Sequence, residues 1–264
     1  MLTADQHRQL AQRLFVAEQN RQPLTPLSDE YPQLQSGDSY AIQALLLDCH
    51  GRAVEGFKLG FTSAAMREQM GVDEPNLGAL LTGTRADQQV AIGGFIHPRV
   101  EPEIALQTGR SLEGRELSIT QIVEATEAIF PALEIVDSRF CDYRFRSVDN
   151  IADNSSAAGY ALGRGVPAGS IAAPESLRCK LFRNGEVVGQ GVGADAMGGP
   201  FQALLWLVKK LSTMGKILPA GSIVLTGGLT RAMVAAPGDQ FRVEFDPPLG
   251  DLELTFTSAG SAAG

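Results

Sequence analysis

Long apolar stretches, runs of basic residues and paired cysteines are all absent from this sequence of 264 residues. No apolar segment approaches the ~20 residues that a membrane-spanning helix needs, and the start, MLTADQHRQL, lacks the apolar centre of a signal peptide. The formal net charge is -8 without any cluster of Lys or Arg, so neither nucleic acid nor an anionic membrane is an expected partner. We therefore expect a cytoplasmic protein that binds no nucleic acid and no membrane.

Cysteine and histidine are scarce, with three residues of each. Cys49, Cys141 and Cys179 lie too far apart for the close pairing of a zinc ribbon or a redox motif. No G-x-G-x-x-G motif follows a predicted strand, which disfavours a dinucleotide-binding fold. Hydrophobic residues make up 44% and charged residues 20%, a mixture typical of globular proteins rather than disordered ones.

The first part of the chain has the pattern of two helices. A cap at Thr3 and an apolar stripe behind it predict a helix over residues 3–19. Asp38 or Ser39 can cap a second helix that ends near Gly51. We predict that residues 1–80 form a helical part, packed on a catalytic domain of residues 81–264.

The remainder contains short, often alternating apolar runs bounded by Gly, Pro, Asp or Asn, which predict strands. Asn184-Gly185 predicts a tight hairpin between two of them. Irregular alternation with helices favours an α+β fold with a folded-over, mixed sheet, and the small-residue tail of residues 258–264 is expected to fray. The predicted strands are 56–63, 97–109, 132–139, 177–189, 222–228 and 240–256, and the predicted helices are Ile119 to Phe130 and Pro200 to Met214.

Three carboxylates stand out as a charge problem. Glu101 and Glu103 are two apart, so on a strand both project from one face and repel each other unless a cation compensates. Glu134 lies among apolar neighbours in FPALEIV, where an ionised carboxylate needs a partner. An all-oxygen set without histidine suits Mg²⁺ or Mn²⁺ rather than zinc. The alternatives are a solvated E-x-E face, and a Glu134 that pairs with Arg99 or Arg139.

Several other residues have both a functional and a structural interpretation. Lys58, in the Gly-flanked strand GFKLGFTS, either pairs with an anion or has a lowered pKa suited to proton transfer, unless it only extends from a strand edge. Residues 148–163 and 225–230 are rich in turn-forming residues and either line a pocket or form structural turns. His97 is a candidate base or a histidine that simply begins a strand.

Five segments together resemble the 2-keto-4-pentenoate hydratase and 4-oxalocrotonate decarboxylase family, within the fumarylacetoacetate-hydrolase-like superfamily. They are GFKLGFTSAAMREQMGV, HPRVEPEIAL, FPALEIVDSR, ADNSS and LPAGSIVLTGGLTRAMVAAPGD, in order along nearly the whole chain. The resemblance implies a mixed β-sheet roll with an N-terminal helical part, and a Mg²⁺ or Mn²⁺ ion held by Glu101, Glu103 and Glu134.

The resemblance also implies that Lys58 contacts the substrate or moves a proton, and that Ser155 or Ser156 faces the pocket. The substrate is expected to be a small 2-oxo acid, and a homo-oligomer and a complex with an enzyme of the same pathway are expected by analogy. Further substrate contacts are expected from Thr62, Ser63, Asn76, Leu77, Thr226, Gly227 and Gly228.

Two lyase activities fit the resemblance. Lys-Leu-Gly at 58–60 and Gly-Gly-Leu-Thr at 227–230 favour decarboxylation of 2-oxo-3-hexenedioate to 2-hydroxypenta-2,4-dienoate, with the 2-oxo group taking up the electrons. The alternative is hydration of that dienoate to 4-hydroxy-2-oxopentanoate. The segment EPNLGALL departs from both patterns, because hydratases usually carry Asp where Asn76 stands and decarboxylases an apolar residue followed by Tyr. Gly199 also replaces the His of the family's common Gly-His-Pro.

Two readings from other classes stay open. One is a relative that keeps the fold as a binding or regulatory protein without turnover. The other is a hydrolase that cleaves carbon-carbon bonds of acylpyruvates, which would need a Glu-His pair in the N-terminal part, where His50 is the histidine nearest the acidic strand.

Overall fold

Two mixed β-sheets run through the computed structural model, which describes residues 1–258. The larger sheet has eight strands in the order β2-β1-β10-β4-β5-β6, with β11 beside β4 and β7 beside β5, and the smaller has the order β3-β13-β12-β8-β9. Strand β1 pairs with β10 in parallel, as β13 does with β3, whereas the other pairs are antiparallel. The strands are β1 (Val54–Gly60), β2 (Asn76–Leu81), β3 (Gln89–Ala91), β4 (Arg99–Thr108), β5 (Thr126–Val136), β6 (Ala157–Leu162), β7 (Val166–Pro167), β8 (Arg178–Arg183), β9 (Glu186–Val192), β10 (Ile223–Leu225), β11 (Met233–Val234), β12 (Gln240–Phe245) and β13 (Asp251–Thr257).

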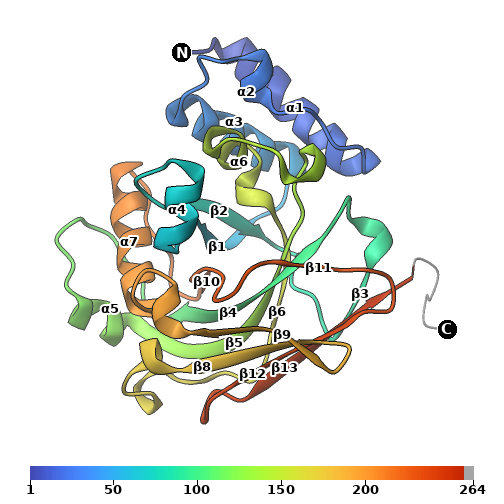
Figure 1. The fold of residues 1–264 in the computed structure, drawn as a ribbon. Helices are drawn as coiled ribbons and strands as arrows, with labels where there is room; N and C mark the ends of the chain where they lie inside the picture. The colour runs from blue at the N-terminus through green and yellow to red at the C-terminus, as the bar shows by residue number, and fades with distance from the viewer. Residues whose placement is uncertain (259–264) are drawn as a thin grey trace.

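The helices gather in two places (Figure 1). Helices α1, α2, α3 and α6 lie together at one end of the sheets, and α5 and α7 lie along one side. The α-helices are α1 (Ala4–Asn20), α2 (Leu27–Glu30), α3 (Ser36–His50), α4 (Ala64–Met70), α5 (Ile119–Ala125), α6 (Ser147–Ala152) and α7 (Pro200–Thr213). Short 3-10 turns are η1 (Ile92–Gly94), η2 (Cys141–Tyr143), η3 (Asn154–Ser156), η4 (Ala168–Ser170), η5 (Pro174–Ser176) and η6 (Gly193–Asp195).

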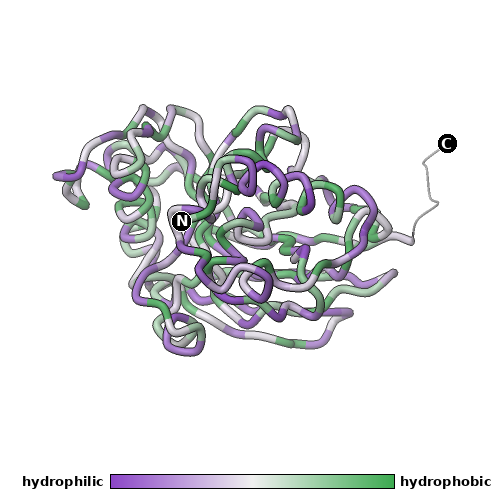
Figure 2. Tube along the Cα trace, turned by 90° about the horizontal axis from the view of Figure 1, so that it is seen from above, coloured by the Kyte–Doolittle hydropathy of each residue, from purple (hydrophilic) through white to green (hydrophobic). Residues whose placement is uncertain are grey.

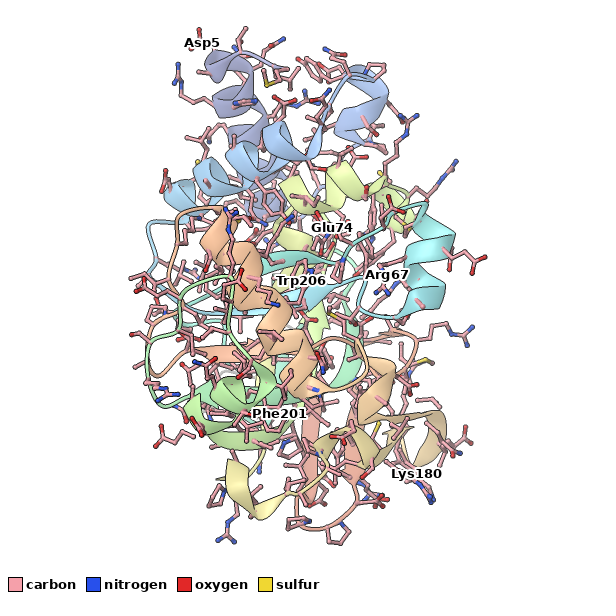
Figure 3. All side chains as sticks on the ribbon, turned by 90° about the vertical axis from the view of Figure 1, so that its left-hand side faces the viewer. Asp5, Arg67, Glu74, Lys180, Phe201 and Trp206 are labelled. Carbon is pink, nitrogen blue, oxygen red and sulfur yellow. The ribbon has the colours of Figure 1, made fainter. Side chains whose placement is uncertain are left out.

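The main apolar core involves both sheets and the buried face of α7. Leu204, Leu207 and Leu211 repeat at helical spacing on that face and are buried with residues of β4, β5, β8 and β12. Figure 3 labels Phe201 and Trp206 along the same helix, and both pack partly buried against this core. A second apolar cluster, built from α1, α2, α3 and α6, includes Leu14 and Ile42 and ties the helical end together.

Most predicted elements are confirmed, including the α+β class. Thr3 caps α1 by accepting a hydrogen bond from the Gln6 N–H, as expected. The second helix begins at Ser36, before its predicted caps. Asn184 and Gly185 have φ of 53° and 84°, the left-handed pair of a tight hairpin turn.

The predicted helix from Ile119 to Phe130 is wrong beyond Ala125. Residues 126–130 begin strand β5, where Phe130 lies opposite Ala105 of β4. Pairing along almost all of β4 outweighs the helical pattern of the sequence, because tertiary packing overrides local propensity. The expectation of strand at residues 61–63 is also wrong, since β1 ends at Gly60 and Ser63 caps helix α4.

The division at residue 80 stays a prediction, and strands β1 and β2 of residues 54–81 belong to the larger sheet. The tail expected to fray lies outside the described residues except for Ser258. Figure 2 shows hydrophilic and hydrophobic residues interleaved along the chain. Within residues 1–258, no helix is both long enough and apolar enough to span a bilayer.

Candidate metal centre and substrate cavity

The three predicted carboxylates come together on one face of the larger sheet. Glu101 on β4 lies directly opposite Glu134 on β5, and Glu103 follows two residues later on the same face of β4. One oxygen from each of the three lies within 4.8 Å of the others. The strand register therefore brings together residues that are 33 positions apart in the sequence.

Burial makes this cluster electrostatically unstable without a cation. Glu103 and Glu134 are fully buried, and burial together with the Glu134 charge raises the pKa of Glu103 well above its usual range. Burial also raises the pKa of Glu101, to about 7, with the Glu134 charge adding to the effect. Oε1 of Glu103 and both carboxylate oxygens of Glu134 accept no hydrogen bond from any described residue. Glu134 Oε1 has only the ion pair with Lys58, and Glu103 Oε1 and Glu134 Oε2 have no partner and can bind a ligand.

Lys58 supplies the nearest positive charge. Its Nζ lies 3.3 Å from Glu134 Oε1, and both side chains are buried. Burial lowers the pKa of Lys58, but the charges of Glu134 and Glu101 outweigh that effect, and the net shift is upward. Of the two predicted roles, the structure shows pairing with an anion. When all three carboxylates are ionised, the cluster with Lys58 keeps two negative charges.

The alternative pairing of Glu134 with an arginine is wrong. Arg139 Nε lies 2.5 Å from Asp153 Oδ1 and also approaches Glu18. Arg99 instead stacks on the Tyr143 ring. The positive charge beside Glu134 is instead that of Lys58 on β1. Strand β10 lies between β1 and β4 in the sheet, so Lys58 reaches the face that carries the carboxylates.

The predicted glycine turn after β10 holds two of the carboxylates. The Gly227 N–H donates to Glu103 Oε2 at 2.7 Å, and a Cβ on Gly228 would lie 3.1 Å from the Glu101 carboxylate. Gly227 has φ of 116°, and a Cβ there would meet Thr62 Oγ1 at 2.1 Å, so no larger residue fits. Thr226 donates its hydroxyl to the Ile104 carbonyl, which fastens the turn to β4.

The predicted serines lie on a strained turn beside Lys58. Lys58 Nζ donates to the Ser155 carbonyl at 3.1 Å, and Ser155 Oγ is 3.4 Å from the same nitrogen. Ser155 Oγ also donates to Asn76 Oδ1, whose amide nitrogen in turn donates to Asn150. Ser156 Oγ bonds to Asp153 and Asn150. A continuous polar network thus runs from the Arg139–Asp153 pair to Lys58.

A cavity of about 240 Å³ opens beside this cluster. Four of its lining residues have left-handed backbone φ angles of 53° to 57°, namely Phe61, Tyr143, Ser155 and Ser156. Such strain costs energy and collects at functional sites, so this concentration marks the cavity as one. The complete lining is Lys58, Gly60, Phe61, Met66, Gln69, Met70, Arg99, Glu101, Val136, Tyr143, Phe145, Asn150, Ser155, Ser156 and Ala232.

Sequence reasoning missed Arg99, Tyr143, Gln69 and Asn150 as cavity residues. Arg99 could have been found, because it precedes Glu101 by two positions and must share its face of β4. Tyr143 carried no local signal, since its place depends on the turn of η2 that returns the chain to the sheet. The predicted base His97 donates its Nε2–H to the Ser138 carbonyl at 2.8 Å and does not line the cavity.

The remaining predicted contacts lie elsewhere. Thr62, Ser63 and Gly228 line a neighbouring cavity of about 770 Å³, which shares Met66 and Gln69 with the first. Arg67, labelled in Figure 3, lies on helix α4, and its guanidinium donates to the Phe61 and Thr62 carbonyls. Leu77 is buried in the main core. Substrate-binding roles for these residues stay predictions.

The Glu-His pair that a carbon-carbon hydrolase would need lies away from the carboxylate cluster. Glu18 and His50 do form a pair, at 3.5 Å, but they line a separate crevice of about 60 Å³ that shares no residue with the 240 Å³ cavity beside the triad.

Gly199 stands where the family commonly has a histidine. It precedes α7 with φ of 140°, and a Cβ there would meet Glu175 at 2.8 Å. The backbone here therefore has no room for the family's histidine as it stands.

Comparison with known proteins assigns the chain to a family. Residues 77–257 match the family described as fumarylacetoacetate (FAA) hydrolase C-terminal. The chain belongs to this family. It is 36% identical over 267 residues to a 2-keto-4-pentenoate hydratase of Paraburkholderia xenovorans (strain LB400), with 97% of each chain covered. It is 32% identical over 249 residues to a 4-oxalocrotonate decarboxylase of Pseudomonas sp. (strain CF600), which covers 92% of this chain and 94% of that one.

A solved structure resembles this FAA hydrolase family member over nearly the whole chain. A 4-oxalocrotonate decarboxylase from Pseudomonas putida G7, complexed with magnesium and adipate, superposes with a TM-score of 0.93 at 30% identity, covering 97% of this chain and 99% of that one. The predicted resemblance to hydratases and decarboxylases, and the β-roll it implied, are confirmed.

The acidic triad of this family member fits a divalent metal. Its donors are all carboxylate oxygens, the preferred ligands of Mg²⁺ and Mn²⁺. Two of these oxygens, Glu103 Oε1 and Glu134 Oε2, have no polar partner among the described residues, and the two negative charges left beside Lys58 match one divalent ion. The same set would be a poor zinc site, because no histidine or cysteine of the described residues joins it.

Proposed function

We propose that the protein is a Mg²⁺-dependent decarboxylase of 2-oxo-3-hexenedioate, with 2-hydroxypenta-2,4-dienoate as product. The observation that carries this choice is the lining of the cavity beside the triad, which contains two cations, Lys58 and Arg99, and two amides but no carboxylate outside the triad. Hydration needs a group that removes a proton from water, whereas decarboxylation needs only an electron acceptor and a proton donor. This lining suits the second reaction.

Glu101, Glu103 and Glu134 would hold the metal, with Mn²⁺ as an alternative to Mg²⁺. The ion, when bound, would act as a Lewis acid toward the 2-oxo group of the substrate. The Gly227 N–H keeps one oxygen of Glu103 in place and leaves the other free. Support of this kind around metal ligands commonly changes affinity by about 10- to 100-fold.

Lys58 is the proposed proton-handling residue. In the reaction the C5–C6 bond breaks, CO₂ leaves, and the electron pair shifts through C4 and C3 onto the 2-oxo oxygen, which takes up one proton. Burial lowers the pKa of Lys58 and the surrounding carboxylates raise it above its usual range, which favours a protonated Nζ, and a cation bound to those carboxylates would ease release of that proton. The Ser155 carbonyl and hydroxyl fix the direction of that nitrogen.

Asn76 supports decarboxylation over hydration. Its amide holds Ser155 and Asn150 through hydrogen bonds of 2.9 and 2.8 Å, and an amide cannot serve as the base that an aspartate at this position could provide. Hydration of 2-hydroxypenta-2,4-dienoate is the second candidate function, favoured by the 36% identity to a protein of that name. We also propose that the protein is cytoplasmic, forms a homo-oligomer and associates with an enzyme of the same pathway.

One experiment distinguishes decarboxylation from hydration. The purified protein with Mg²⁺ is given 2-oxo-3-hexenedioate and, separately, 2-hydroxypenta-2,4-dienoate, with an EDTA-treated sample as control. Release of CO₂ from the first acid without loss of the second supports the proposal. Hydration of the dienoate without CO₂ release would replace it with the hydratase reading, and the absence of both reactions would favour a relative without turnover.

A further inference from the structure

We propose that Arg99, held by the ring of Tyr143, binds a second carboxylate of the substrate and makes this a site for 2-oxo diacids. The inference rests on the proposed function, because it takes the acidic triad as the place where the 2-oxo acid end is bound. It adds the group that would recognise the other end of the molecule.

Arg99 has no direct ion-pair partner among the described side chains, although its charge lowers the pKa of Glu101 two residues along β4. Its guanidinium carbon lies 3.8 Å above the centroid of the Tyr143 ring, and it forms no hydrogen bond or ion pair with another described side chain. Stacking covers the flat faces of a guanidinium and leaves its N–H donors, which lie in the plane, free for a planar acceptor. A carboxylate is the acceptor that fits two parallel donors.

Tyr143 is built to hold this position. Its hydroxyl donates to the Val136 carbonyl at 2.8 Å, and Val136 lies directly opposite Arg99 in the β4–β5 pair. The His97 ring packs against it at 4.8 Å between centroids. The backbone of Tyr143 is left-handed, with φ of 57°, a conformation that is costly for a bulky residue. The strain is explained if this ring must sit under Arg99.

The spacing suits a six-carbon chain. Arg99 and Glu101 are alternate residues on one face of β4, so their Cα atoms lie about 7 Å apart. An extended chain from the second to the sixth carbon covers roughly 5 Å, given bonds of about 1.5 Å. An acid bound at the triad by its 2-oxo end could therefore place a terminal carboxylate at Arg99. Both residues line the 240 Å³ cavity.

The charges lead to the same conclusion. A divalent ion would neutralise the two negative charges that the triad and Lys58 leave together. Arg99 would then be the unbalanced charge in the lining, since the cavity contains no other free cation or carboxylate among the described residues. A ligand with two carboxylates restores the balance, whereas a monocarboxylate leaves Arg99 without a counterion.

Two saturated acids with the same head group test the inference by calorimetric titration in the presence of Mg²⁺. 2-Oxoadipate has the second carboxylate and 2-oxohexanoate lacks it. Wild-type protein is expected to bind 2-oxoadipate about 10- to 100-fold more tightly, the usual effect of hydrogen bonds to a charged group. Arg99→Met should abolish that preference while 2-oxohexanoate and Mg²⁺ still bind, with Mg²⁺ no weaker than in wild type because a nearby positive charge is removed.

Two further variants separate recognition from folding. Arg99→Lys keeps the charge but not the paired donors, and should retain only part of the preference. Arg115→Met removes an exposed arginine and should change nothing. Equal binding of the two acids by wild type, or an equal loss of both in Arg99→Met, would overturn the inference while leaving the proposed function standing. Binding of neither acid would overturn the proposed function, and this inference with it.

Discussion

Glu101 and Glu134 lie face to face across the antiparallel pair of β4 and β5, with Lys58 Nζ 3.3 Å from the Glu134 carboxylate. Like charges directly opposite each other destabilise a sheet, so this register would be selected against if the cluster served stability alone. Because Glu134 is fully buried and Glu101 only partly exposed, the cluster is a site that a bound cation would stabilise.

Lys58→Met separates proton transfer from metal binding. The ammonium competes with a cation for Glu134, so its removal should leave Mg²⁺ affinity unchanged or increase it. Turnover should fall by about 100-fold or more, because a general acid contributes 10²- to 10⁴-fold. Steady-state CO₂ release and Mg²⁺ titration check the two effects. The exposed lysine on β8 gives the control Lys180→Met, and loss of Mg²⁺ binding in Lys58→Met would contradict the assigned role.

The benefit of Mg²⁺ for stability should increase with pH. The pKa of Glu101 is raised to about 7 by burial, so the metal-free folded protein keeps a proton that the unfolded chain loses near pH 4.5. This contribution to stability is present at low pH and is lost as the pH rises through about 7. The Tm difference between Mg²⁺ and EDTA samples should therefore be larger at pH 8 than at pH 5.5.

Glu101→Gln is the control for this pH effect. The variant should lose part of the Tm decrease that EDTA-treated wild type shows between pH 5.5 and pH 8. An Mg²⁺-dependent Tm difference that is the same at both pH values would show that Glu101 does not hold a proton in the metal-free protein.

Asp153→Asn should destabilise the fold. Asp153 is buried and lies 2.5 Å from Arg139 Nε, so its replacement leaves a buried guanidinium without its counterion. Breaking such a pair costs about 3–5 kcal/mol. Urea unfolding monitored by circular dichroism measures the free energy of unfolding. Asp142→Asn, at an exposed position, is the matched control, and equal stability of the two variants would contradict the role of the pair.

The chemistry of the site was more predictable than its shape. Glu101, Glu103 and Glu134 could be grouped from the sequence because each posed a problem of charge among apolar neighbours, and such problems have few solutions. The alternative in which Glu134 pairs with Arg99 or Arg139 was wrong, and the ion pair with Lys58 was not foreseen. Lys58 reaches Glu134 only because β1 and β4 both pair with β10.

Features that depend on long-range pairing were the ones missed. The segment from Thr126 to Phe130 continues a helical pattern in the sequence, and only its partner strand β4 makes it β structure. Tyr143 and Ser155 themselves have left-handed backbones, which neither residue type favours, so their own identity does not mark the turns that bring them to the cavity. The Gly227-Gly228 turn was identified as a place of close approach, but what approaches is the protein's own carboxylates.

The central claim is that Glu101, Glu103 and Glu134 bind one divalent ion, and Mg²⁺ titration of Glu134→Gln tests it most directly. Wild-type protein and Glu127→Gln, which alters an exposed glutamate of the same strand, should each bind one Mg²⁺ per chain. Glu134→Gln should keep its circular dichroism spectrum and lose at least about 100-fold in affinity, more than the loss of a supporting residue costs. Wild-type affinity and full turnover in Glu134→Gln would contradict the account.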